Sequence, residues 1–336
     1  MTSDIQITHT SPSGVKTTFK NIKPSAVKWK VSVSNFTDTC EITLPLFPYL
    51  TSTGTNSTVF SERADSGNTV FHEGDYVEVR LGYYAIDEHL FFKGFIKRIN
   101  YAQPLVLECE GYSYQLKDII FNKSYKKTTF KQVLNDLIKG TDIILSNFVP
   151  DVSLSNLTFK NVPGLKMLEW FQKECLCAVN FDFNELYVGA SKYTVPKPTE
   201  KLRIGWNTVA DKELKKDESD TKVIINLVEK SSTGTVKRTK SEQKRYDNVK
   251  EVKVRPGLPD VFLRTVAAEL QKLENYRGYK GSVTAFLMPF FDKGYGCEII
   301  DGKFPDRAGK YFVESVEGSF DSGGGRQKLT LIYYGK

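Results

Sequence analysis

The sequence predicts a mainly β protein with α+β character, in which two antiparallel β-barrel domains flank a small α+β domain with two helices. Short apolar runs that alternate with polar residues fill the first third of the chain and much of the last third. A helical period of apolar residues replaces them in between. The length of 336 residues fits two or three domains. We therefore divide the chain into a first barrel (1–118), the small α+β domain (119–198) and a second barrel with one helix and a basic arm (199–336).

The first block is expected to consist of strands. Between residues 27 and 33, Val and Trp alternate with Lys and Ser, which is typical of a half-buried strand. Further strands are expected at Ile42–Leu44, Tyr76–Leu81, Phe91–Ile99 and Leu105–Cys109. The stretch Thr51–Asn68 is rich in Thr, Ser, Gly and Asn without any period, and it predicts a long exposed loop. Several short strands at this spacing favour a small barrel or a sandwich.

The second block changes to a helical period. Apolar residues recur at i, i+3, i+4, i+7 and i+8 over residues 130–138, the two threonines before them can cap a helix, and Gly140 can end it. A second helix is expected to start at Pro163, a favourable first-turn residue. A hairpin is predicted over Ala178–Val188. These elements together indicate one small α+β unit.

The third block is again rich in strand patterns. One helix is expected after Pro259. The expected strands are Lys222–Val228, Val252–Val254, Ser282–Met288, Cys297–Ile300, Tyr311–Val316 and Leu329–Tyr334. The glycines 323–325 predict a turn between the last two strands, because no lysine and hydroxyl residue of a phosphate loop follow them. The first and third blocks share a similar order of glycine turn and strands, which suggests two related barrels.

The positive charge of the chain is concentrated in one segment. Lys and Arg exceed Asp and Glu by 47 − 40 = 7, and the segment Glu229–Arg255 alone holds nine basic and four acidic residues. We interpret it as a solvated loop or a long hairpin that can contact an acidic partner or, weakly and without sequence preference, DNA. The candidate contact residues are Lys237, Arg238, Lys240, Lys244 and Arg245.

No residue pattern indicates catalysis, a cofactor or a metal. The three histidines, His9, His72 and His89, lack ligand spacing and are expected to be solvated turn residues, since a metal site would need separate loops to converge. Cys175 and Cys177 form a Cys-x-Cys pair without a second pair at zinc-finger spacing, and we expect core thiols. The sequence therefore predicts a protein that is not an enzyme.

The composition also indicates the cellular environment of the protein. Five cysteines are an odd number, which favours reduced thiols. The N-terminus is polar and lacks the pattern of a signal peptide, and no apolar stretch is long enough to span a bilayer. We expect a soluble intracellular product without membrane insertion.

The order of the blocks and their short motifs resembles the hub proteins of phage tail baseplates. The group meant is the Mu-like tail protein and late control protein D group, which is related to the front part of type VI secretion spike proteins. The first barrel motif is matched by Phe71, Gly74, Asp75, Val77, Val79, Phe92, Gly94 and Ile96, and its closure by Gly111, Ser113, Leu116 and Asp118. The two-helix domain is matched by Asn161–Cys177, Leu186 and Val188. The second barrel is matched by Gly309, Tyr311, Val313, Val316, Gly323–Gly325, Leu329 and Leu331.

The resemblance implies a structural role without an active site. Three copies would form a ring of tube-like barrels that adapts the sixfold tail tube to a threefold spike. The implied partners are the tail tube protein, a separate central spike protein and other baseplate proteins, in the tail tip of a virion assembled in the host cytoplasm. The loop Thr51–Asn68 and the basic arm have no counterpart in this pattern.

Three other functions stay open at this point. The protein could be the hub of a long non-contractile tail, which has the same barrels. It could be a tail-associated wall hydrolase, although such enzymes carry their hydrolase after the hub-like region. A carbohydrate-binding surface protein is disfavoured by the missing signal peptide.

Overall fold

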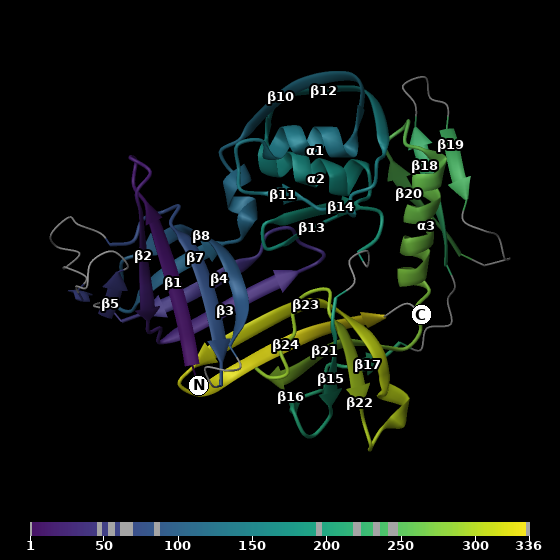
Figure 1. Cartoon of the computed structure of the whole chain (residues 1–336). Helices are drawn as coiled ribbons and strands as arrows, with labels where there is room; N and C mark the ends of the chain where they lie inside the picture. The colour runs from purple at the N-terminus through teal and green to yellow at the C-terminus, as the bar shows by residue number, and fades with distance from the viewer. Residues whose placement is uncertain are drawn as a thin grey trace.

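The computed structural model shows a mainly β chain with three α-helices in the part of the chain that it describes (Figure 1). The described residues are 2–45, 49–52, 58–60, 70–83, 88–192, 197–217, 223–230, 236–240 and 248–333. Two regions of one large sheet, a helical unit above them and a small sheet with a third helix make up the chain (Figure 1). The mainly β class predicted from the sequence is confirmed.

The large sheet has sixteen strands, and nine of them come from the first block of the chain. These nine strands, which we call the first lobe, are β1 (Thr2–Thr10), β2 (Lys16–Ile22), β3 (Ala26–Ser32), β4 (Thr39–Leu44), β5 (Tyr49–Ser52), β6 (Thr58–Phe60), β7 (Tyr76–Gly82), β8 (His89–Asn100) and β9 (Leu105–Glu110). Their order in the sheet is β3-β4-β9-β8-β7-β1-β2-β5-β6. The alternation at residues 27–33 marks β3, where Val27, Trp29 and Val31 are buried and the lysines between them are exposed.

The expected loop Thr51–Asn68 is partly wrong. Residues 51–52 end β5 and residues 58–60 form β6, and these two strands pair as an antiparallel hairpin at the edge of the first lobe. β5 also pairs with β2. Backbone pairing to β2 therefore orders a polar stretch that has no apolar period of its own. Residues 53–57 and 61–69 lie outside the described residues.

The other seven strands of the large sheet form the second lobe. They are β15 (Thr199–Arg203), β16 (Thr208–Ala210), β17 (Lys215–Lys216), β21 (Tyr279–Phe286), β22 (Gly296–Ile300), β23 (Gly309–Asp321) and β24 (Gly324–Tyr333). The turn predicted at the glycines 323–325 joins β23 to β24. Each lobe contains a meander of consecutive antiparallel strands, β7-β8-β9 in the first and β22-β23-β24 in the second.

The prediction of two separate closed barrels is not confirmed. The strands described here form one open sheet, because β3 of the first lobe pairs with β23 of the second instead of with the far edge of its own lobe. The purple and blue strands of the first lobe thus continue into the yellow strands of the second (Figure 1). The edges of β3 and β23, which would otherwise be unpaired, are paired with each other across the two lobes.

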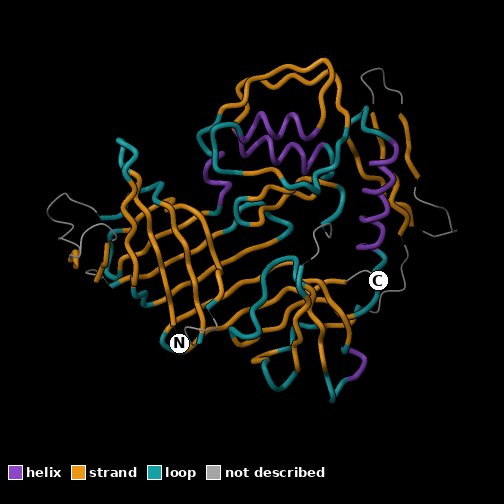
Figure 2. Tube along the Cα trace, viewed as in Figure 1, coloured by secondary structure: helices purple, strands orange, loops and turns teal. Residues whose placement is uncertain are grey.

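The middle unit contains the two predicted helices, α1 (Phe130–Ile138) and α2 (Gly164–Glu174). Thr129 caps α1, since its hydroxyl accepts a hydrogen bond of 3.3 Å from the backbone N–H of Gln132. Its strands are β10 (Ile120–Thr129), β11 (Ile144–Leu145), β12 (Ser153–Pro163), β13 (Ala178–Asp182) and β14 (Glu185–Gly189). The ribbon β10–β12 arches over both helices, and the predicted hairpin β13–β14 lies on their other side (Figure 2).

The third helix, α3 (Asp260–Glu274), belongs to a small sheet of its own. The sheet consists of β18 (Val223–Lys230), β19 (Val236–Lys240) and β20 (Asn248–Val254). β18 and β19 are antiparallel, as in the long hairpin predicted for the basic arm, whereas β20 returns to pair with β18 in parallel. We call these three strands the basic sheet.

Three apolar clusters form the core. One lies in the first lobe and one in the second. The third joins both helices of the middle unit to the inner faces of α3 and the basic sheet, including Ile225, Leu227 and Leu263. The basic sheet, although it comes from the third block of the chain, thus shares its core with the middle unit. No described helix is long and apolar enough to cross a membrane.

Candidate functional site

The pairing of β3 with β23 is the joint between the lobes. It runs from Ser315 opposite Ser32 to Asp321 opposite Ala26. Within it Gly318 lies opposite Trp29, and a Cβ at position 318 would overlap the six-membered ring of the indole. The indole thus covers the glycine across the strands, a pairing that pins the register of a sheet.

One face of this joint is a charged groove shared by the two lobes. Its volume is about 680 Å³, and residues of β3, β4, β8, β9, β21, β23 and β24 line it. Opposite charges face each other across its strands, with 3.7 Å from Lys28 Nζ to Glu41 Oε1 and 2.5 Å from Lys30 Nζ to Glu317 Oε1. Because acids neutralise the lysines locally, this face suits a solvated surface better than tight binding of a polymer with one sign of charge.

Ion pairs connect the lobes to each other and to the middle unit. Lys293 of the second lobe contacts Asp38 of the first, and both residues are buried. Lys197 lies 3.1 Å from Asp182 of β13 and 3.2 Å from Asp292 of the second lobe. The cavity between these groups measures only about 40 Å³. That space suits one or two water molecules and is too small for a substrate.

The pKa values in this network follow from burial and pairing. Burial raises the pKa of Asp38 to about 6, although the ammonium of Lys293 acts in the opposite direction. Burial disfavours the charged form of Lys197, but Asp292 and Asp182 outweigh it and hold its pKa above the usual value. A perturbed carboxyl can mark an active site. Here the paired charges connect the first lobe, the second lobe and the middle unit, so their role in this network is structural.

The basic residues chosen from the sequence are only partly placed. Lys237, Arg238 and Lys240 lie on β19, while Lys244 and Arg245 lie outside the described residues. β19 is an outer strand of the basic sheet, since the order is β19-β18-β20. The structure therefore puts three of the five on one strand, and whether they contact a partner or DNA stays a prediction.

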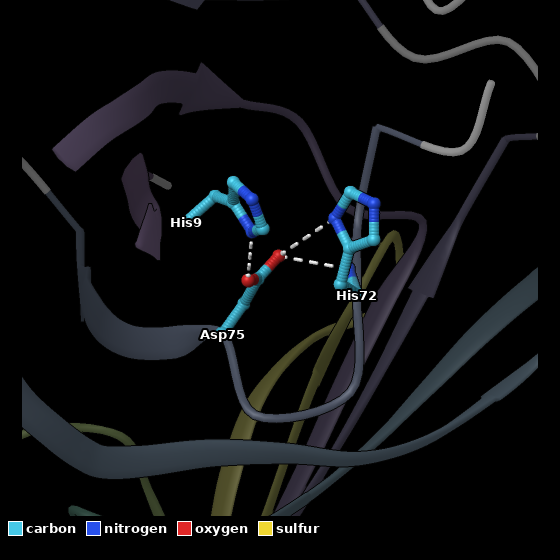
Figure 3. A group of neighbouring side chains, drawn as sticks. All are labelled: His9, His72 and Asp75. Carbon is cyan, nitrogen blue, oxygen red and sulfur yellow. Dashed lines mark hydrogen bonds and ion pairs between the residues drawn. The ribbon is translucent and has the colours of Figure 1, made fainter. Parts of the chain in front are cut away.

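Two of the three histidines meet at a buried carboxylate, which the sequence did not suggest. Nδ1 of His9 lies 2.7 Å from Oδ1 of Asp75, and Nδ1 of His72 lies 3.8 Å from Oδ2 (Figure 3). The Asp75 side chain is 3% exposed. The third histidine, His89, is elsewhere and stacks on Phe290 with ring centroids 4.7 Å apart. Only the register of β1 against β7, which places Thr8 opposite Tyr76, brings His9 to Asp75.

The expected core thiols are confirmed. Cys175 and Cys177 are buried, and so are the other three cysteines, all of them free. Burial raises the pKa of every one of these thiols above its usual value. They are therefore protonated packing groups at neutral pH.

Comparison with known proteins identifies the fold. No family model and no curated protein matches the sequence. The chain is similar to the 43 kDa tail protein of prophage MuSo2 from Shewanella oneidensis, at 12% identity and a TM-score of 0.58 over 98% of both chains. It is similar to a tail protein from Neisseria meningitidis MC58, at 12% identity and a TM-score of 0.62 over 98% of this chain and 96% of that one.

A third similar structure is the E. coli c3393 protein, at 13% identity and a TM-score of 0.56 over 99% of this chain and 77% of that one. It is described as a component of the type VI secretion system that resembles the T4 tail proteins gp27 and gp5. At these identities the likeness shows the fold. The protein has the fold of phage tail hub proteins, which confirms the resemblance inferred from the sequence.

Proposed function

We propose that the protein is a structural hub at the tip of a phage or phage-like contractile tail. The observation that carries the proposal is the two-lobed sheet with the middle unit above it, whose fold matches phage tail proteins from end to end. A charged groove lies across the two lobes and a network of ion pairs joins them, and both suit assembly rather than catalysis. The proposed place of action is the tail tip of a virion assembled in the host cytoplasm.

The proposed assembly is a homotrimer. In each chain the two lobes would each serve as one tube-like unit, so three chains would offer six such units to a sixfold tail tube and keep threefold symmetry for a separate spike. Edge-to-edge pairing already joins the lobes within one chain through β3 and β23. Among the described strands, the main path of the sheet ends at β6 and β16, and these ends are available to neighbouring copies.

The proposed partners are the tail tube protein, the spike and other baseplate proteins. The type VI secretion relative supports this set, because it is described as resembling tail proteins of phage T4. The basic sheet is proposed as a contact for an acidic partner, with only weak and non-specific binding of DNA. Its backbone edge at β19 can reach such a partner, since β19 pairs only with β18 among the described strands.

The mass of the assembly in solution tests the proposal. Light scattering at high protein concentration, and again with the neighbouring tail proteins co-produced, should give three copies per particle. A monomer or a dimer under both conditions would contradict the threefold hub. An electron-microscopy map of the complex would show whether six lobes surround one axis.

Two alternatives have their own tests. A hub of a non-contractile tail would have the same fold, and a sheath gene beside the gene of this protein would exclude it. A tail-associated wall hydrolase would release soluble fragments from purified peptidoglycan. We expect no release, because the groove carboxylates of Glu41 and Glu317 are paired with lysines and the cavity at the ion pairs is too small for a glycan or peptide strand.

A further inference from the structure

The meeting of His9, His72 and Asp75 is the one place in the described chain where three potential metal ligands converge. Their ligand atoms all lie within 4.8 Å of one another. Two imidazoles contribute nitrogen and the carboxylate contributes oxygen, and both Nδ1 atoms face the carboxylate (Figure 3). This cluster is separate from the joint, the groove and the ion pairs described above.

The local backbone holds the carboxylate in place. Asp75 closes a turn in which its backbone N–H donates to the carbonyl of His72 at 3.1 Å, and Gly74 supplies the left-handed residue with a φ of +88°. The Asp75 Oδ2 atom accepts a hydrogen bond of 2.8 Å from the backbone N–H of His72. The turn positions the carboxylate and β1 positions His9. Binding an ion would therefore lose little additional conformational entropy, because folding has already ordered these groups.

The distances suit a small cation. Zinc bonds to nitrogen and oxygen are about 2.0–2.2 Å long, so neighbouring ligand atoms in a tetrahedral site are about 3.4 Å apart. The two histidine–carboxylate distances, 2.7 and 3.8 Å, lie on either side of that spacing. Shifts of the ligand atoms by about 0.4–0.7 Å would therefore bring both distances to the tetrahedral spacing.

We propose that His9, His72 and Asp75 bind one first-row divalent transition cation, for which Zn²⁺ is the best-suited ion. Imidazole nitrogens favour zinc and its neighbours over Ca²⁺ and Mg²⁺, which take oxygen ligands. The His9 and His72 side chains are 28% and 46% exposed, so an ion can enter and water can complete its coordination. The bound ion fastens the N-terminal strand β1 to the turn before β7.

An ion bound by His9, His72 and Asp75 would also affect the outer edge of the first lobe. β1 pairs with β7 on one side and with β2 on the other, and β2 carries the hairpin β5–β6. An ion at the end of β1 therefore stabilises the strands through which the outer edge of the sheet is attached. The proposal does not depend on the function of the protein as a hub.

Metal titration of the untagged full-length chain tests the proposal. Calorimetry with Zn²⁺ and absorption spectra with Co²⁺ should show one saturable site per chain, and Zn²⁺ should raise the thermal midpoint relative to EDTA. His9→Gln and His72→Gln should each weaken binding at least about tenfold, since each removes a ligand. The matched control is His89→Gln, which removes the remaining histidine and should leave binding unchanged.

Three outcomes would overturn the proposal. The first is no saturable binding by the unaltered chain, which would leave the cluster as a hydrogen-bonded turn. The second is equal binding by the His72→Gln variant and the unaltered chain. The third is an intense near-ultraviolet thiolate band with Co²⁺, which would put the metal on cysteines. Circular dichroism of each variant in EDTA checks that a loss of binding is not a loss of folding.

Discussion

Replacing Gly318 by alanine tests whether the pairing of β3 with β23 holds the two lobes together. A Cβ at this position would overlap three atoms of the Trp29 indole, which is 4% exposed. The indole is not free to move aside, because it packs edge-on against Phe91 with ring centroids 4.8 Å apart. After the substitution, the β3–β23 pairing and the packing of Trp29 in the core of the first lobe cannot both keep their present geometry.

The size of the effect follows from the contact distances. Carbon atoms pack at about 3.5–4.0 Å, so the indole has to retreat by about 1.5 Å. Overpacking of a core costs about 1–3 kcal/mol, and complete expulsion of the ring would approach the cost of deleting it, about 3–5 kcal/mol. The lower entropy of the unfolded alanine chain offsets only about 0.4–1 kcal/mol. We expect the free energy of unfolding to fall by about 1–3 kcal/mol.

Urea denaturation followed by circular dichroism measures this change. Gly302→Ala is the matched control, because a Cβ there has no neighbour within 4 Å. Combining Gly318→Ala with Trp29→Phe should cost less than the sum of the two single changes, since a smaller ring leaves room for the methyl group. Equal stability of the Gly318→Ala and Gly302→Ala variants would refute the reasoning about the joint.

Three other predictions address the remaining parts of the chain. Leu134 of α1 is fully buried, so Leu134→Asp should cost about 3 kcal/mol or more and abolish soluble protein, whereas Asn135→Asp on the exposed side should be tolerated; equal yields would contradict the helix packing. Burial raises the pKa of Asp38 to about 6, so between pH 7 and pH 5 the folded state takes up a proton that the unfolded state does not. The free energy of unfolding should therefore rise by about 1.4 kcal/mol from pH 7 to pH 5. The Asp38→Asn variant should not show this rise. Neutralising the five candidate residues of the basic arm should reduce a DNA affinity that is weak and falls steeply with salt, whereas tight sequence-selective binding at physiological salt would exclude our interpretation.

The helices could be predicted from the sequence because their determinants are local. Apolar spacing and a capping threonine identified α1, and a proline at the start identified the first residues of α2 and α3 to within one residue. Most strands with a buried face were predicted for the same reason, such as β3 and β7. These patterns depend only on neighbours in the chain.

The missed strands have few buried residues or depend on distant partners. β10 and β12 form a two-stranded ribbon whose residues are largely exposed, so their sequences lack an apolar alternation. β1 and β2 lie in a polar N-terminal segment, and their register is set by the pairing of β1 with β7 and of β2 with β1. The joint of β3 with β23 connects segments almost 300 residues apart, and no local pattern encodes it. The histidine–aspartate cluster was missed for the same reason.

The contacts between the lobes and the middle unit bear on the proposed role of the chain as an adapter between two symmetries. The middle unit packs on the first lobe through apolar residues such as Phe95 and Tyr112. Apolar packing is not directional, so by itself it holds the two parts together without fixing their relative orientation. Lys197 adds a directional constraint, because it has to meet Asp182 and Asp292 together. The Lys197 side chain is 14% exposed, so an arrangement that leaves its ammonium without a partner is disfavoured, even though such pairs add little net stability. The proposed hub, which would join two different symmetries, would require that kind of fixed orientation, and the ion pairs of Lys197 and the joint of β3 and β23 are the contacts that would supply it.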